Sequence, residues 1–197
     1  DSSVRDHASP LVQGQPDLYI DVQNAASLLM RLELLGVDVG GRWSELADKA
    51  AKRIGDHLVP FTLPHWMMAL AATERWDACR DLMEAMRAHA ATAQGDDAWT
   101  VGHVALPAAE AVLAHRRGDH AGALAALLPA RHDLGRLGGS HAQRDILWQI
   151  MVDAALRGGD EAMARRLIAE VAAARAPWPV PGFYRAALTR SAGRSGT

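Results

Sequence analysis

Four side chains near the start of one predicted helix could bind or act on an anionic ligand. In the stretch GGSHAQRDILWQ (residues 138–149), His141, Arg144, Asp145 and Trp148 fall on one face of a helix. An arginine in the first turn opposes the helix dipole, so Arg144 is expected to have an anionic partner. If the protein is an enzyme, His141 would be the general acid or base and Asp145 would orient it.

The same stretch also fits a structural interpretation. Ser140 followed three residues later by Gln143 is a capping box, in which each side chain bonds to the backbone N–H of the other residue. Capping does not explain Arg144 and Asp145, but a polar network between helices could hold them in place of a ligand. The sequence leaves both interpretations open.

Three histidines recur at a constant interval along the chain. His65, His103 and His141 are equally spaced, and each is predicted near the start of the first helix of a pair. Stacked pairs would place these positions in a row along a groove, so His65 and His103 are also predicted to contact the ligand. Neighbouring helices pack about 8–10 Å apart, so the outer histidines would lie roughly 16–20 Å apart and could not share one metal ion. With no zinc-binding motif present, we expect no metal and no other cofactor.

The first predicted helix has a second polar face. Asn24, Ser27 and Arg31 are three and four residues apart and lie opposite a leucine stripe. Asn24 and Arg31 are therefore predicted to bind the ligand, with a surface ion pair as the alternative for Arg31. Three further histidines lie among charged residues and are expected to be exposed to solvent: His115, His120 and His132.

Helical periodicity covers almost the whole chain, because apolar residues recur at intervals of three and four. The predicted helices span about residues 18–35, 41–54, 75–92, 99–116, 119–134, 140–157 and 160–174, and one more begins at Thr62. Pro107 is expected to kink the helix that contains it. No segment has the alternating pattern of a β-strand.

The helices repeat in pairs. The tetrapeptides RWDA, GDHA and GDEA each open the second helix of a pair, with their alanines at Ala78, Ala121 and Ala162. An Arg-Trp dipeptide recurs at 42–43 and 75–76. Periods of roughly 30 to 45 residues are typical of α-solenoids. We predict an all-α fold, a tetratricopeptide-like α-solenoid of about four helix pairs in a right-handed superhelix with a concave polar groove. A non-repetitive helical bundle is the alternative.

The predicted organisation has one folded unit. Residues 17–175 are expected to form the helical-repeat domain, residues 1–16 an irregular N-terminal segment, and residues 176–197 a Pro/Gly-rich extension and disordered tail.

Composition excludes some function classes. The 197-residue chain has a formal net charge of −2, which argues against nucleic acid as a partner. No apolar run is long enough for a membrane span. The single cysteine, Cys79, excludes an intramolecular disulfide and is compatible with a reducing cytoplasm. It lies on an apolar helical seam with Trp76, Met83 and Met86, so we expect it to be a packing residue.

Three segments carry a resemblance to a known family: SLLMRLELLGVDVGGRWSELA, DHLVPFTLPHWMMALAA and GGSHAQRDILWQIMVDAALRGGDEAMARRLIAE. They resemble the tetratricopeptide-repeat-protein-38-like family over about residues 18–174, most specifically in the string GSHAQRD. The family's members are about twice as long, and these segments resemble their C-terminal half. The resemblance implies a closed or strongly curved helical superhelix with an inward-facing polar pocket. Asn24 stands at a position that is more often acidic in relatives.

The resemblance also leads us to expect a partner. The N-terminal half of the same protein would be a separate chain or would have been removed, and it would complete the pocket. This expectation agrees with the absence of an initiating methionine.

Two functions compete. The first is a cytoplasmic binding or scaffold module that presents a pocket lined by histidine, arginine and aspartate to a small molecule or peptide. The alternative is an enzyme of small-molecule or natural-product metabolism, in which His141 and Asp145 form an acid–base pair and Arg144 holds an anionic substrate in the composite pocket.

Overall fold

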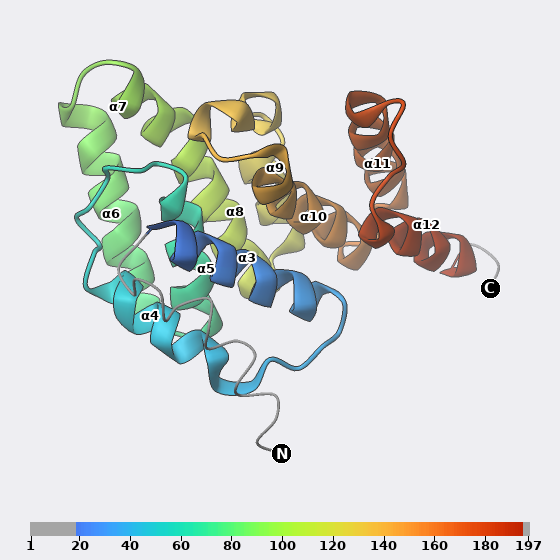
Figure 1. Cartoon of the computed structure of the whole chain (residues 1–197), viewed down its shortest axis with the longest axis horizontal. Coiled ribbons are helices and arrows are strands. Elements are labelled where there is room, and N and C mark those ends of the chain that lie inside the picture. The colour runs from blue at the N-terminus through green and yellow to red at the C-terminus, as the bar shows by residue number, and fades with distance from the viewer. Residues whose placement is uncertain (1–18, 195–197) are drawn as a thin grey trace.

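The computed structural model describes residues 19–194, and this part of the chain is helical with no β-strand (Figure 1). The α-helices are α3 (Tyr19–Leu34), α4 (Trp43–Ala51), α5 (Thr62–Ala72), α6 (Trp76–Thr92), α7 (Asp96–Thr100), α8 (Leu106–Arg116), α9 (His120–Leu127), α10 (His141–Arg157), α11 (Glu161–Arg175) and α12 (Gly182–Arg194). Two 3-10 segments, Gly40–Arg42 and Arg131–Leu137, and one π-helical segment, Val101–Ala105, lie between them. The all-α prediction is confirmed. None of the described helices is both long and apolar enough to cross a lipid bilayer.

Helix α5 lies at the centre of the helices. Every residue from Thr62 to Ala71 is buried, because the sequence of this helix is apolar on all sides and lacks a solvent-facing stripe. Helices α3, α4, α6 and α8 all pack against it. Pro64 occupies the first turn, where its missing N–H leaves no helical hydrogen bond unmade.

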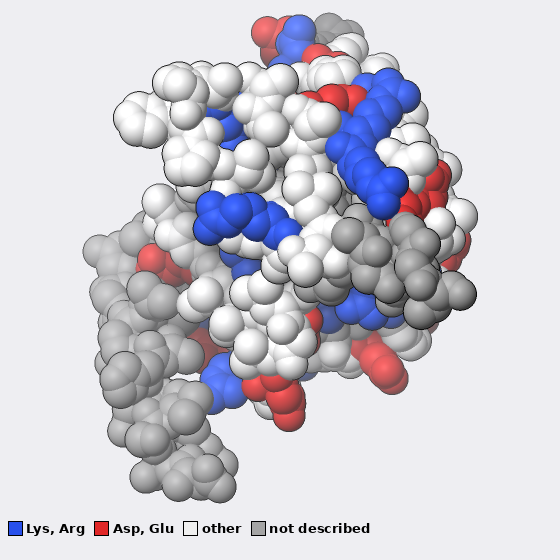
Figure 2. All heavy atoms as spheres, turned by 90° about the vertical axis from the view of Figure 1, so that its right-hand side faces the viewer, with Lys and Arg blue, Asp and Glu red and all other residues white. Residues whose placement is uncertain are grey.

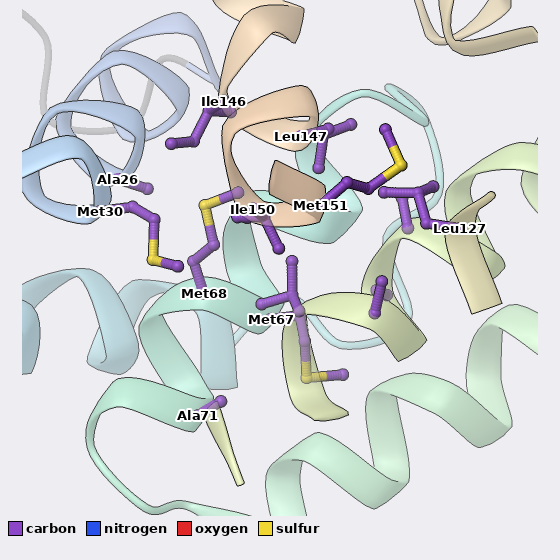
Figure 3. Close-up of a cluster of buried hydrophobic side chains, with 14 of the residues drawn as sticks. Ala26, Met30, Met67, Met68, Ala71, Leu127, Ile146, Leu147, Ile150 and Met151 are labelled. Atoms are coloured by element: carbon purple, nitrogen blue, oxygen red, sulfur yellow. The ribbon is translucent and has the colours of Figure 1, made fainter. Parts of the chain in front are cut away.

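The first and fourth helical pairs are in direct contact, because α10 packs on α3 as well as on α9 and α11. Figure 3 shows the core where they meet, with Met30 of α3, Met68 of α5, and Ile146 and Ile150 of α10 gathered in one cluster. These side chains are almost completely buried. Apolar packing therefore fills the space where α3, α5 and α10 meet.

A regular interval joins side chains of successive helical pairs. Five pairs of residues that are 38 or 39 positions apart form hydrogen bonds or ion pairs: Gln23–Thr62, Ser27–His65, His115–Asp153, Arg131–Glu170 and Asp145–Tyr184. The three predicted histidines are 38 residues apart, which is also the sequence separation of the contacting pairs Ser27–His65 and His115–Asp153. The tetratricopeptide-like arrangement and the handedness of a superhelix remain predictions.

The segment before Pro107 is π-helical, a departure from regular α-helix at the position where a kink was predicted. Proline lacks an N–H, and its ring clashes with the carbonyl four residues earlier. The chain relieves this with the π-helical segment Val101–Ala105, in which the N–H of Leu106 bonds to the carbonyl of Val101. His103 lies inside this widened turn.

The prediction that regular structure ends near residue 176 is wrong, because α12 follows the proline-rich link. Phe183, Tyr184 and Ala187 recur at helical spacing and are buried, and α12 packs on α10 and α11. The prolines interrupt the helical array without ending it. The expected irregular segment 1–16 and the last three residues of the expected disordered tail lie outside the described residues.

Cys79 is a packing residue, as predicted. Its side chain is fully buried, and burial raises the pKa of its thiol to about 11. A thiol in this environment stays protonated at neutral pH and is a poor nucleophile.

Candidate functional site

The predicted site at the start of α10 is held by protein partners. The capping box is present, with Ser140 Oγ accepting from the Gln143 N–H at 3.2 Å and the Ser140 N–H donating to Gln143 Oε1 at 2.8 Å. Arg144 donates to the carbonyl oxygens of Gly138, at 2.8 Å, and of Gly139. Both glycines have left-handed backbone, with φ of 87° and 69°. Main-chain carbonyls therefore take the place of the anionic partner expected for Arg144.

Asp145 is also engaged by neighbouring side chains. Its carboxylate accepts a hydrogen bond from Gln149 Nε2 at 2.7 Å and another from the hydroxyl of Tyr184 at 2.7 Å. Burial and the Asp145 carboxylate raise the pKa of Tyr184, so this hydroxyl keeps its proton and acts as the donor. His141 is exposed at the start of α10 and makes no hydrogen bond with a described residue. Asp145 therefore orients Tyr184 and α12, and the predicted His141–Asp145 pair is not formed.

The two candidate residues of α3 reach the same end of α10. Arg31 donates to the carbonyl of Ala142 at 2.7 Å, and the amide of Gln143 donates to Asn24 Oδ1 at 3.1 Å. Burial lowers the pKa of Arg31, and the nearby Asp145 carboxylate acts in the opposite direction. These contacts match the alternative interpretation, a polar network that ties α3, α10 and α12 together.

The three equally spaced histidines occupy three different environments. His65 is completely buried, its Nδ1 donating to the Phe61 carbonyl at 2.7 Å and its Nε2 lying 3.1 Å from Ser27 Oγ. Burial lowers its pKa to about 4, so it is neutral at pH 7. His103 is exposed and stacks on Trp99 at 4.6 Å. With His141 exposed, the three side chains share no partner in the described structure. Trp148 is half-buried against the core.

A histidine that was expected to be solvated forms a closer pair. His115 Nε2 lies 2.8 Å from Asp153 Oδ2, and the side chains of His115 and Asp153 are only 9% and 6% exposed. Arg157 Nε donates to the same carboxylate oxygen at 2.6 Å. The expectation for His115 was wrong because α10 covers the last turn of α8. The missed signal was the interval, since Asp153 follows His115 at the same spacing that separates the three predicted histidines.

The environment of Asp153 keeps its carboxylate ionised. Burial by itself would raise the pKa of Asp153, but the hydrogen bonds and charges of His115 and Arg157 outweigh it and leave the pKa below its ordinary value. The other ring nitrogen of His115, Nδ1, is buried without a hydrogen-bond partner among the described residues. His120, whose pKa is lowered by burial, lies 5.5 Å away between ring centroids.

A pocket of about 400 Å³ opens beside this charged pair. It lies where α3 and α10 end and α11 begins, and we name it the Asp153–Arg157 pocket. Its lining residues are Leu34, Leu35, Gly36, Asp153, Leu156, Arg157, Gly159 and Glu161. Apolar side chains from two helices thus border a buried carboxylate and a guanidinium that is 55% exposed.

The surface charge of the described residues is mixed. Figure 2 shows basic and acidic side chains scattered among uncharged residues on the face that it draws. Among residues 19–194, no three histidine, cysteine, aspartate or glutamate side chains are placed to hold a metal ion.

No model of a known protein family matches the chain, and no solved structure matches it.

Proposed function

We propose that the chain is a helical-repeat binding module for a small molecule and that the Asp153–Arg157 pocket is its ligand site. The sequence predicted a pocket with histidine, arginine and aspartate at the start of α10. The proposed pocket has the same residue types near the end of α10, where Asp153 contacts His115 and Arg157. The observation that carries the proposal is the ionised, nearly buried Asp153, fixed by His115 and Arg157 at the edge of a cavity.

The composition of the pocket suits a ligand with one polar end. Small-molecule sites have volumes of about 300–1,000 Å³ and combine apolar walls with a few fixed polar groups. Leu34, Leu35 and Leu156 offer apolar contact, while Asp153 and Arg157 offer a hydrogen-bond acceptor and donors. Because His115 and Arg157 already hold the carboxylate, little side-chain ordering is needed on binding.

The finer architecture belongs to the same proposal. Helix pairs joined at one regular interval support a tetratricopeptide-like, right-handed array of the kind found in the family that the sequence resembles. The single cysteine supports a cytoplasmic location. An N-terminal half of the same protein would extend the wall of the pocket.

The test is a fragment screen by NMR with ¹⁵N-labelled protein. Binding fragments are expected to shift the amide signals of residues 34–36 and 153–161. Leu35→Arg places a charged side chain at the pocket lining and should abolish these shifts, while Leu58→Arg, at another exposed leucine, should leave them unchanged. Leu35 and Leu58 are 54% and 77% exposed, so neither change disturbs the core. Fragments that bind the wild type and Leu35→Arg equally well would refute the pocket as the site.

A further inference from the structure

A second cavity, of about 510 Å³, lies between α6 and α8, at residues with no part in the proposed function. Trp76, Met83 and Leu113 contribute aromatic and aliphatic surface to it, and Arg117 lies at the end of α8. The guanidinium of Arg117 stacks over the Trp76 ring, 4.9 Å from its centroid. We name this cavity the Trp76–Arg117 groove.

The acidic residues of the groove already have partners. Asp77 pairs with Arg80 at 2.7 Å, and Glu110 pairs with Arg87 at 2.9 Å. Asp119 accepts from the Gly122 N–H as the N-cap of α9. Arg117, in contrast, makes no ion pair with any residue of the described range, and the indole N–H of Trp76 makes no hydrogen bond there. The groove thus has a cation and a neutral donor without an acceptor.

The chain contains a completed version of the same arrangement. Arg116, the residue before Arg117, stacks over Trp43 at 5.0 Å. There the carboxylate of Glu33 serves both groups, since Oε1 accepts from the Trp43 indole N–H at 2.9 Å and Oε2 lies 2.6 Å from Arg116 Nη2. The second contact is an ion pair and not a hydrogen bond, since Arg116 Nη2 donates to Met30 Sδ at 3.1 Å. Stacked arginine and tryptophan therefore accommodate one carboxylate between them.

We propose that the Trp76–Arg117 groove binds a carboxylate ligand with an apolar body. The ligand's carboxylate takes the role that Glu33 has at the buried pair: it accepts from the Trp76 indole N–H and forms an ion pair with Arg117. The stacked guanidinium keeps its in-plane N–H groups available for this contact. The ligand's aliphatic or aromatic body packs on Met83 and Leu113. The proposal does not depend on the Asp153–Arg157 pocket.

The experiment uses two probes of nearly the same size, 4-phenylbutyrate and its neutral amide, 4-phenylbutanamide, in which an NH2 group replaces one carboxylate oxygen. Binding is followed by the NMR signal of the Trp76 indole N–H, which is assigned by its loss in Trp76→Phe. We expect a saturable shift with 4-phenylbutyrate and affinity about tenfold lower for the amide, because the charged hydrogen bonds are lost.

Two arginine variants make the test specific. Arg117→Gln should weaken 4-phenylbutyrate binding about tenfold. Arg136→Gln is the matched control, because Arg136 also stacks on a tryptophan, Trp99, at 4.6 Å, but pairs with Asp133 and lines neither pocket. It should bind as the wild type does.

Three results would overturn the proposal: no saturable shift of the Trp76 signal with 4-phenylbutyrate, equal affinity for the acid and the amide, or unchanged affinity in Arg117→Gln. A third probe, an acetylated tripeptide that ends in phenylalanine with a free carboxylate, tells whether the ligand is a peptide C-terminus or a small organic acid. Tighter binding than 4-phenylbutyrate would assign the groove to peptide C-termini, and weaker binding to small organic acids.

Discussion

Two adjacent arginines at the end of α8 cover two tryptophans, and the two pairs differ in what surrounds them. Trp43 is 3% exposed, its indole N–H donates to Glu33, and Glu33 forms an ion pair with Arg116. Trp76, with Arg117, is 37% exposed and lacks the carboxylate. The tryptophans of the two Arg-Trp dipeptides thus each lie under an arginine from the end of α8, while the neighbouring helices decide whether the pair stabilises the core or stays open to a ligand.

The largest expected effect is a difference in how much Trp43 and Trp76 contribute to the stability of the protein. Trp43→Ala should lower the free energy of unfolding by about 3–5 kcal/mol, because it leaves a cavity and removes the indole N–H that Glu33 accepts from. Trp76→Ala should cost about 1 kcal/mol or less, since much of the ring already contacts solvent. Urea denaturation of both variants measures the difference, and equal losses would contradict the assignment of one pair to the core and the other to the surface.

Two of the equally spaced histidines also differ in burial, since His65 is buried and His103 is exposed. The pKa of His65 falls from its ordinary 6.5 to about 4 on burial, so the unfolded chain binds a proton more readily between these pH values. The contribution of His65 to stability is expected to be constant above pH 6.5 and to fall by up to about 3 kcal/mol as the pH drops from 6.5 to 4.

Denaturation curves across this pH range test the prediction with a matched pair of variants. His65→Gln should remove most of the dependence between pH 6.5 and 4, whatever its effect on stability at pH 7. His103→Gln should retain it, because His103 is exposed. A dependence that persists in His65→Gln would show that another group is responsible.

The smallest expected effect concerns the carboxylate that distinguishes the two stacks. Glu33→Gln removes the charge that pairs with Arg116 in a half-buried site and should cost about 1–3 kcal/mol. Glu110→Gln, which removes the acid of the Arg87 ion pair beside the open stack, should cost about 0.5 kcal/mol or less because both side chains are well exposed. Thermal or urea denaturation of both variants measures the two losses of stability. An equal or larger loss in Glu110→Gln would contradict a stabilising role for the Glu33–Arg116 pair.

Most helices could be predicted from the sequence, because the signals that mark a helix lie within it or at its ends. Apolar spacing, the capping box at Ser140 and the glycines between helices are local signals, and most observed bounds lie close to those predicted. The predicted helix 119–134 is an exception, because α9 ends at Leu127 and a 3-10 segment, Arg131–Leu137, follows. Helix α12 was missed because the prolines before it were read as the end of regular structure, although Phe183, Tyr184 and Ala187 have helical spacing.

The candidate site was harder to predict because its contacts are long-range. Nothing near Arg144 in sequence reveals that backbone carbonyls would satisfy it, or that Tyr184 would bind Asp145 from 39 positions away. The charged neighbours of His115 suggested exposure, whereas burial by α10 decided its environment. The constant interval of the three histidines was the transferable signal, and extending it from His115 would have indicated Asp153.

The contact between α3 and α10 has a consequence for how the chain folds. In an open array each helix pair touches only its neighbours, so the ends can unfold while the middle persists. Here the Arg31–Ala142 hydrogen bond links residues 111 positions apart, and α3 and α10 share the core around Met30 and Ile150. Opening either end uncovers this core. Unfolding should therefore be a single cooperative transition, and folding must wait for distant segments to meet, which slows it relative to an open stack of similar size.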